Sequence, residues 1–523
     1  MHAHIRTAAA LGFTLATASS TLCQPRAVVM TGDMLPGFGT NAIAGFGSFR
    51  LNDLGQVAVR SSGSSVGGIW RFDPDGVVTP AAVSGDDIPG VSFGTFLNNF
   101  EEVSMNDLGQ IAFNSFVSTT GRTVWITEAN AQLTGPAFAS NRTYLTSRLD
   151  NSGGLGVSSG ISGDDFIGYV LPANNRETFA TAVGQEAFAD NGYAVYREVT
   201  NTQVFQEAIT RLQSGQNRQE IARSGVQNGA GVTFGSLFGD ASINAQGTLV
   251  FRASYTLSGG ETGRGLWVGG TGFPTPQLLV NEGDAAPGEP GSTFNSLFTA
   301  ELHDSGVLFF AAGVDSPSGD ASFGIYAIDT VTRATTPILT EDTVIDGFGG
   351  RSIDRVNEWY ANDNGSVVLA IELASEGATA TEAALVGYDG GTGRLETLFQ
   401  IGDMLEVAPG DEREIAALKL PGEITSGTSD QFVDLRTGVL NSQDEFVFRA
   451  TFADGSSGLF VAGVAIDPCA ADANGDGLVT PADFTAWVLA FNTETPGCDQ
   501  NGDGLCQPSD FSAFIANYNN GCP

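Results

Sequence analysis

A short pattern that combines a turn with a strand recurs along most of the chain. In its clearest form an apolar residue precedes Asn-Asp-x-Gly and a strand with alternating apolar residues follows, as at residues 51–59 and 105–113. Consecutive copies begin 39 to 79 residues apart, which is enough for one antiparallel meander each. We find eight copies, which begin at Leu51-Asn52, Met105-Asn106, Leu149-Asp150, Phe188-Ala189, Ile243-Asn244, Leu302-His303, Ala361-Asn362 and Leu440-Asn441.

Each copy contains a further strand that carries a large aromatic residue in several cases, such as Trp70, Trp125 and Trp267. When the strand before the Asn-Asp turn is counted, a copy has four strands. Four-stranded units of roughly 40 to 60 residues in series are typical of β-propeller blades. The sequence therefore predicts an all-β body over residues 27–466 that forms an eight-bladed β-propeller. The third and fourth copies are short, so a seven-bladed propeller stays open, as does a β-solenoid.

The two ends of the repeated region complement each other. The last copy stops after residues 458–463 and lacks its final strand, whereas residues 27–37 form an unpaired copy of that strand. Pairing the two segments would remove two exposed sheet edges, which otherwise invite aggregation. We therefore expect the N-terminal strand to close the propeller.

Acidic residues dominate the charge of the chain. Its 523 residues include 59 Asp and Glu against 23 Lys and Arg, which gives a formal net charge of -36, and Lys419 is the single lysine. Proteins bind phosphate groups with clustered Lys and Arg. We therefore expect neither nucleic acids nor anionic membranes as partners.

The N-terminus has the features of a secretory signal peptide. Basic residues precede an apolar, alanine-rich run at residues 8–18, so we expect a signal peptide over residues 1–18, with a boundary as late as residue 23. The run is shorter than the about 20 apolar residues of a membrane span, and no later stretch approaches that length. We expect a secreted, extracellular protein that is associated with the cell surface.

The last part of the chain carries the same calcium-ligand spacing twice. Calcium takes six or more oxygen ligands, and a loop of this spacing supplies them from its side chains and from the backbone carbonyl of its seventh residue. The two loops predict two calcium ions, bound by Asp472, Asn474, Asp476, Leu478, Thr480 and Asp483 and by Asp499, Asn501, Asp503, Leu505, Gln507 and Asp510.

A short amphipathic helix is predicted after each loop. The apolar positions follow the i, i+3, i+4, i+7 rule, with Phe484, Trp487, Val488 and Phe491 in the first helix and Phe511, Phe514, Ile515 and Tyr518 in the second. From Asp467 onward the chain has eight acidic residues and no Lys or Arg. Such a small, self-repelling unit has too little core to fold alone, so we expect calcium to drive its folding.

Four cysteines lie in the same small unit, at Cys469, Cys498, Cys506 and Cys522. An even number of cysteines in a small extracellular unit indicates two disulfides, although the spacing does not give their pairing. A transition-metal site is the alternative, but no histidine lies nearby and paired CxxC sequences are absent.

In its loops and helices the tail, residues 467–523, resembles a type I dockerin, the paired calcium module that docks onto cohesin domains. It is most similar to the cysteine-containing dockerin-like anchors of secreted bacterial proteins. The resemblance implies a cohesin-like or other envelope or scaffold protein as the partner of the tail. The tail departs from cellulosomal dockerins at Pro481-Ala482 and Pro508-Ser509, where those proteins carry a hydroxyl-rich pair.

The resemblance also bears on the disulfides and on the body. Because the ends of dockerins lie close together, it favours pairing Cys469 with Cys522, which leaves Cys498 for Cys506. The body resembles the repeat domains of uncharacterised secreted bacterial proteins that carry such anchors. That second resemblance implies no activity.

Several residues of the body allow both a structural and a functional interpretation. Acids in Gly-Asp turns can line a cation-binding ring, but we interpret them as turn residues that accept backbone hydrogen bonds. These acids are Asp33, Asp86, Asp284 and Asp403. The aromatic residues of the repeats can stack on sugars, but we interpret them as core. His303, the one histidine left after signal cleavage, is interpreted as a turn residue and not as a catalytic base.

No sequence motif of catalysis stands in a fitting context, so we assign no catalytic or cofactor-binding residue. A mechanism that uses two carboxylates stays open, and we interpret the irregular stretch at residues 411–419 as a solvated loop. We expect a non-catalytic binding or surface protein, whose propeller presents a face to a polysaccharide or protein ligand and whose calcium-loaded tail anchors it. The alternative is an extracellular polysaccharide hydrolase or lyase with the same tail.

Overall fold

The computed structural model divides the chain into two compact units. One spans residues 25–465, and the other combines residues 1–24 with residues 466–523. The structure describes residues 25–63, 66–87, 95–117, 121–140, 146–149, 151, 155–159, 166–170, 176–181, 186–189, 193–201, 206–213, 218–238, 241–317, 319, 321–340, 343, 345, 353–373, 382–421, 438–464, 471, 473, 479–493, 498, 500 and 506–520. The predicted signal peptide, Cys469 and Cys522 lie outside these ranges.

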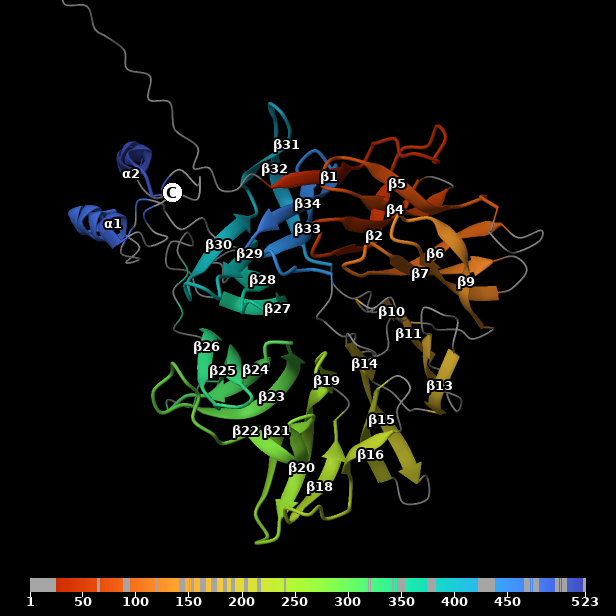
Figure 1. Cartoon of the computed structure of the whole chain (residues 1–523), viewed down its shortest axis with the longest axis vertical. Helices are drawn as coiled ribbons and strands as arrows, with labels where there is room; N and C mark the ends of the chain where they lie inside the picture. Colours follow the sequence, from red (N-terminus) through yellow and green to blue (C-terminus); the bar gives the residue numbers. More distant parts are fainter. Residues whose placement is uncertain are drawn as a thin grey trace, which may run out of the picture. The chain divides into compact units, whose positions relative to one another are not determined.

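The body consists of antiparallel sheets that follow one another along the chain (Figure 1). The first four sheets each pair four strands in sequence order. They are β2 (Gly45–Leu51), β3 (Val57–Ser62), β4 (Gly67–Phe72) and β5 (Val78–Val83); β6 (Phe96–Met105), β7 (Ile111–Val117), β8 (Gly121–Thr127) and β9 (Leu133–Ser140); β10 (Thr146–Leu149), β11 (Leu155–Ser159), β12 (Phe166–Val170) and β13 (Arg176–Thr181); and β14 (Glu186–Ala189), β15 (Tyr193–Asn201), β16 (Gln206–Gln213) and β17 (Gln219–Arg223).

The next three sheets repeat this arrangement, and the fifth carries one additional short strand, β19. They are β18 (Val232–Leu237), β19 (Ser242–Ile243), β20 (Thr248–Leu257), β21 (Thr262–Gly270) and β22 (Phe273–Asn281); β23 (Thr293–Leu302), β24 (Val307–Asp315), β25 (Ala321–Asp329) and β26 (Thr335–Leu339); and β27 (Ile353–Ala361), β28 (Val367–Leu373), β29 (Glu382–Tyr388) and β30 (Leu395–Gln400). The prediction of an all-β body is confirmed.

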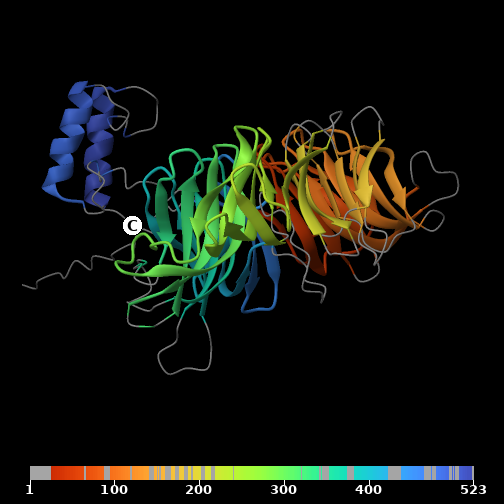
Figure 2. The same cartoon turned by 90° about the horizontal axis from the view of Figure 1, so that it is seen from below.

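The last sheet combines strands from both ends of the body, in the order β1-β34-β33-β32-β31. Strand β1 (Arg26–Met30) pairs with β34 (Ser457–Gly463), and β33 (Glu445–Phe452) lies next to it. The chain colours in Figure 1 therefore run around a ring and bring red β1 beside blue β34, and the side view in Figure 2 shows the strands crossing the thickness of that ring. The prediction that the N-terminal strand completes the last sheet is confirmed.

The hairpin of β31 (Met404–Ala408) and β32 (Asp411–Lys419) corrects the interpretation of residues 411–419 as a solvated loop. Strand β32 also pairs with β33. Leu405, Val407 and Ile415 are buried, whereas the acids between them are more exposed. The charged residues conceal an alternating pattern in the sequence, and this pattern makes the segment a strand.

The Asn-Asp turn has a simple local cause. The side-chain carbonyl of Asn52 accepts the N–H groups of Leu54 (3.1 Å) and Gln56 (2.9 Å), and Gly55 takes the left-handed conformation with φ 68°. An Asn side chain stabilises such a turn and glycine adopts positive φ without strain. Asn106, Asn244, Asn362 and Asn441 repeat both bonds. In the last copy Asp444 stands in place of glycine, with φ 59°.

The aromatic residues of the repeats form the core between sheets. Trp70, Trp125 and Tyr326 have no solvent exposure, and Trp267 is 2% exposed. The ring of Trp70 meets that of Phe38 edge-on at 4.9 Å. Burying each aromatic side chain contributes about 1.5–3 kcal/mol to folding. The interpretation of these residues as core is confirmed, and a sugar-stacking platform is not built from them.

The acids of the Gly-Asp turns have the structural role expected of them. Each of Asp33, Asp284 and Asp403 accepts the backbone N–H of the residue three positions earlier, at 2.8 Å. Asp86 stands in an equivalent turn, where burial raises the pKa of its carboxyl. The turns connect the outer strand of one sheet to the next sheet, so these acids shape separate loops.

The described part of the tail contains two helices, α1 (Pro481–Thr493) and α2 (Pro508–Asn520), which lie side by side (Figure 2). Trp487 of α1 stacks on Phe514 of α2 with ring centroids 5.0 Å apart, and both are buried. A disulfide joins Cys498 to Cys506, as predicted. Among the described residues, no helix has both the length and the apolar character needed to cross a membrane.

Candidate binding pocket at the ring of turns

Consecutive Asn-Asp turns are connected by a pair of hydrogen bonds, which we call a joint. At the first joint the side-chain amide of Asn52 donates to the carbonyl of Asn106 (2.9 Å), and the backbone N–H of Asp53 donates to the carboxylate of Asp107 (2.8 Å). Both asparagines are buried. Leaving a buried polar group unpaired costs about 1–3 kcal/mol, so the joint fixes neighbouring sheets against each other.

The same bonds recur around the body. They run from Asp107 N–H to Asn151, from Asn244 to the His303 carbonyl, from Ala245 N–H to Asp304, from Asp304 N–H to Asp363, and from Asn362 to the Asn441 carbonyl. The last joint connects Asn441 to the carbonyl of Asn52 (3.1 Å) and Ser442 N–H to Asp53 (2.7 Å). The final turn is thereby bonded to the first, so the described joints connect the turns from Asn244 through Asn441 and Asn52 to Asn151 in one series, which we call the ring of turns.

The ring of turns surrounds a pocket of about 130 Å³, lined by residues from turns throughout the body. Its lining includes Asp53, Asp107, Asp304 and Asp363, and its described lining contains no Lys or Arg. Each of these carboxylates accepts a backbone N–H from the preceding turn, so its position is fixed. One water takes about 30 Å³ of liquid, so the pocket has room for one small polar group of a larger ligand.

His303 is the one described turn residue that departs from the asparagine pattern on the joints. Its imidazole is 4% exposed, with Nδ1 3.4 Å from Oδ1 of Asp363 and Nε2 3.5 Å from Oε1 of Glu301. Burial raises the pKa of Asp363, but hydrogen bonds from His303 and from two backbone N–H groups, together with the charge of His303, lower it below its ordinary value overall. The structure places His303 in its turn, as interpreted from the sequence.

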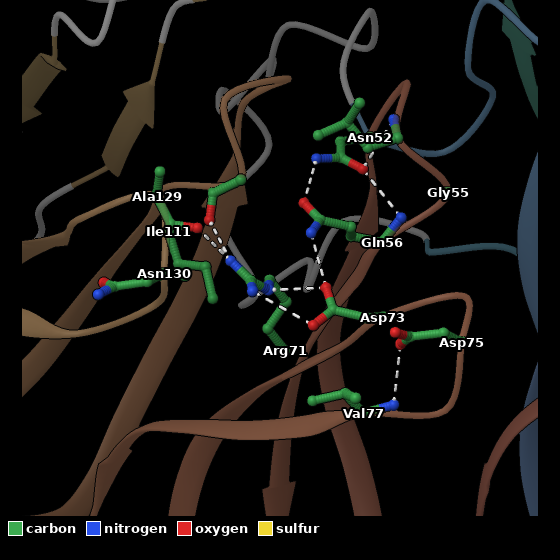
Figure 3. Close-up of polar contacts among 12 residues, drawn as sticks. Asn52, Gly55, Gln56, Arg71, Asp73, Asp75, Val77, Ile111, Ala129 and Asn130 are labelled. Carbon is green, nitrogen blue, oxygen red and sulfur yellow. Dashed lines mark hydrogen bonds and ion pairs between the residues drawn. The ribbon is translucent and has the colours of Figure 1, made fainter.

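Arginines form a second set of contacts between sheets, which the sequence analysis missed. Arg71 on β4 is buried and forms an ion pair with Asp73 (3.0 Å), which also accepts a bond from Gln56 (2.6 Å). The guanidinium donates to the carbonyls of Gly109 and Ala129 in the next sheet (Figure 3). A single cation thus connects two sheets through backbone oxygens.

Other arginines repeat this contact. Arg26 and Arg211 donate to the turn carbonyls of Gly55 (2.8 Å) and Gly247 (2.5 Å), and Arg60, Arg197 and Arg252 donate to Phe100 (2.8 Å), Leu237 (3.3 Å) and Leu297 (2.5 Å). The available signal in the sequence is an Arg directly after an apolar or aromatic strand residue, as in Tyr196-Arg197 and Phe251-Arg252. These arginines donate to backbone carbonyls within the body, and none of them belongs to the described lining of the pocket.

The predicted calcium loops are described only at their ends. The carboxylate of Asp483 accepts the N–H of Thr480 (2.7 Å), and that of Asp510 accepts the N–H groups of Gln507 (2.7 Å) and Gln500 (2.9 Å). Both acids are fully buried at helix starts. These bonds cap the helices, a role that the sequence analysis missed. The pattern Thr480-x-x-Asp483 indicates such a cap for the first helix.

The structure therefore brings together the ninth and twelfth positions of each predicted calcium loop, Thr480 with Asp483 and Gln507 with Asp510. The other eight predicted ligands, Asp472, Asn474, Asp476, Leu478, Asp499, Asn501, Asp503 and Leu505, lie outside the described residues. Among the described residues, no group of three or more His, Cys, Asp or Glu side chains is placed to hold a metal ion. A buried carboxylate at each loop end suits a hard cation, and calcium at these loops stays a prediction.

Comparison with solved structures finds β-propeller proteins at low similarity. The β-propeller domain of the Trilobed protease from Pyrococcus furiosus is 12% identical, with a TM-score of 0.39 over 69% of this chain and 99% of that chain. Dipeptidyl peptidase 4 from Porphyromonas gingivalis is 11% identical, with a TM-score of 0.44 over 80% of this chain and 59% of that chain. Oligogalacturonate lyase from Vibrio parahaemolyticus is 8% identical, with a TM-score of 0.35 over 84% of this chain and 99% of that chain.

Comparison of the sequence gives one further finding. A model described as a family of unknown function, DUF7453, matches residues 24–135 and 171–470. The matched ranges cover the greater part of the body. No curated protein sequence gave a match.

Proposed function

Since the chain belongs to the DUF7453 family, whose function is unknown, membership assigns no activity, and we propose from the sites that this is a secreted, non-catalytic binding or surface protein. In this proposal each of the eight sheets is one blade of an eight-bladed propeller. The pocket at the ring of turns is its ligand site, and the tail is a calcium-dependent attachment module. The observation that carries the proposal is a pocket whose carboxylates are all fixed by backbone hydrogen bonds.

The carboxylate of Asp363 suits binding better than proton transfer. A general acid needs a pKa raised toward the working pH, as in glycoside hydrolysis. The pKa of Asp363 is lowered instead, so its carboxylate stays ionised. A fixed anionic rim attracts an ammonium group, which an amino sugar of a polysaccharide or a lysine of a protein ligand would supply.

The tail proposal rests on the repeated loop spacing and on the capped acids at the ends of both loops. Two calcium ions would offset the charge of the acids in the tail and order the loops before α1 and α2. An ordered tail presents a fixed surface to an envelope or scaffold protein. A dockerin-like role is supported by the resemblance and by the paired helices.

The binding test uses the full chain with fully deacetylated and fully N-acetylated glucosamine oligomers, which differ in their ammonium groups. We expect calorimetric binding of the deacetylated oligomer, at least tenfold weaker in the Asp107→Asn/Asp304→Asn variant. The control is Asp75→Asn, whose carboxylate supports an exposed surface turn. Equal affinity for both oligomers, or no binding, would refute the pocket proposal, and release of reducing ends or unsaturated products would replace it with a hydrolase or lyase.

Attachment has its own test. The full chain serves as bait for envelope proteins of the source cells, once with calcium and once with a chelator. We expect a partner that is retained with calcium and lost with the Asp483→Asn/Asp510→Asn variant. Calcium-independent capture that survives both substitutions would contradict the role of the tail.

A further inference from the structure

The joint between the sixth and seventh sheets differs chemically from the other described joints. Asn52, Asn244, Asn362 and Asn441 each donate from a neutral amide to the carbonyl of the next turn. An amide does not change its charge over the physiological pH range. His303 stands at this place in its own turn, and imidazole is the side chain that gains or loses a proton near neutral pH.

Two carboxylates lie beside the imidazole of His303. Nδ1 lies 3.4 Å from the carboxylate of Asp363 in the next turn, and Nε2 lies 3.5 Å from Glu301 on β23. The ring of Phe309 on β24 meets the imidazole edge-on at 5.2 Å. Asp304 follows His303 in the same turn and lines the same pocket. The described charged groups facing the ring are therefore acids.

Two carboxylates on opposite sides of one imidazole require two donors. The imidazolium form has a proton on each nitrogen, so it directs an N–H group toward each carboxylate, and the 3.5 Å contact of Nε2 with Glu301 is an ion pair without a hydrogen bond. The neutral form has one proton, so one nitrogen then presents its lone pair to a carboxylate. Glu301 is buried whereas half of the Asp363 side chain is exposed, so the change from an attractive to a repulsive contact is largest where the lone pair faces Glu301.

We propose that His303 makes this joint a protonation-dependent latch, which holds the sixth and seventh sheets together when the imidazole is charged and weakens when it is neutral. The acid limit follows from Asp363. Its folded-state pKa is lowered, so its contribution to stability is present above the ordinary carboxyl pKa and is lost only as the pH falls through the lowered value. The other limit is loss of the imidazole proton as the pH rises.

The latch acts at the rim of the pocket, because Asp363 and His303 both line it. The backbone N–H of Asp304 donates to the same Oδ1 of Asp363, at 2.7 Å. Release of Asp363 from His303 therefore loosens the bond that fixes the turn. The inference concerns the joint itself and holds whatever ligand the pocket takes.

The test measures hydrogen exchange of the Asp304 amide in the full chain between pH 5 and pH 8, corrected for the intrinsic exchange rate. We expect its protection to fall about tenfold as the pH rises, which corresponds to about 1.4 kcal/mol. The matched control is the Ser442 amide, which donates to Asp53 at the closing joint without a histidine. A His303→Asn variant should lose the pH dependence at Asp304.

The proposal is overturned if Asp304 and Ser442 respond equally to pH, or if His303→Asn keeps the dependence. If the His303→Asn variant fails to fold, a second measurement on the unsubstituted chain still tests the proposal. Histidine-selective 15N NMR of the full chain reports His303 directly, since the remaining histidines are His2 and His4. An imidazole that stays in one protonation state from pH 5 to pH 8 would also refute the latch.

Discussion

The body and the tail achieve stability in different ways. The body distributes it over many similar contacts, in which most of the described turns are bonded to their neighbours and the last turn is bonded to the first. The described tail has two helices, one disulfide and two buried capping acids. A ring of repeats can fix each element through its neighbours, whereas a pair of short helices has too little core and depends on cross-links and bound ions.

Removing calcium should have the largest effect, and it should affect the tail and the body differently. Chelation in the full chain should unfold the tail and leave the body intact, because the proposed ions stabilise the tail alone. Limited proteolysis with mass measurement should then show cleavage after residue 465 and a resistant body. Unchanged resistance of α1 and α2 after chelation would contradict this prediction. The Asp483→Asn/Asp510→Asn variant should be cleaved in the same way even with calcium.

Replacing Arg71 with Met should have the next largest effect and should act on the body. The change leaves the partly buried carboxylate of Asp73 without its cation and removes donors from the Gly109 and Ala129 carbonyls. We expect the free energy of unfolding to fall by about 3–4 kcal/mol. Guanidinium unfolding followed by tryptophan fluorescence measures it. Arg413→Met is the control because its ion pairs are exposed, and an equally small effect for both variants would argue against the inter-sheet role of Arg71.

Replacing Asn441 with Ala tests the closing joint. The substitution removes the amide N–H that donates to the Asn52 carbonyl. It also removes the side-chain oxygen that accepts the backbone N–H groups of Gln443 and Glu445. We expect a loss of about 2–3 kcal/mol in the free energy of unfolding. Asn52→Ala should cost the same, since closing and internal joints have the same bonds. Asn130→Ala, which affects one exposed turn, should cost little. A much smaller loss for Asn441 than for Asn52 would mean that closure depends on β1 alone.

The smallest effect is expected at a helix cap of the tail. Thr480→Ala removes the hydroxyl that accepts the Ala482 N–H and contacts Asp483. The free energy of unfolding of the tail should fall by about 1 kcal/mol, and that of the body should not change. In a calcium titration followed by circular dichroism, the midpoint of folding should move to a higher calcium concentration. Thr485→Ala, whose hydroxyl bonds within the exposed helix, is the control and should leave the midpoint unchanged.

Much of the body could be predicted from the sequence, because its information is local. The Asn-Asp turn with glycine at positive φ, the alternating strands and the complementary ends are all visible in short stretches, and β1 pairs with β34 as expected. The pairing of Cys498 with Cys506 was likewise within reach of the resemblance. The interpretation of residues 411–419 as a loop was wrong because exposed charged residues obscured the less exposed positions between them, of which Ile415 is buried.

The joints and the arginine contacts could not be predicted, since they depend on which turn lies beside which. Asn52 carries the same sequence signal whether its amide meets water or the carbonyl of Asn106. Arg71 likewise gives no sign in the sequence of which carbonyls it will meet. The calcium loops are the opposite case, because their spacing is specific in the sequence and eight of their twelve residues fall outside the described ranges.

The pairing of β1 with β34 has a kinetic consequence. Its contacts span the whole body, as in the bond from Ser457 N–H to the hydroxyl of Thr31 across 426 residues. Strand β1 is among the first segments of the body to be synthesised, and its partner is among the last. Contacts of such long range form slowly, and strand edges promote aggregation for as long as they stay unpaired. The body therefore completes its folding only after nearly all of it is available, and until then the exposed edges of β1 and of the growing array need protection.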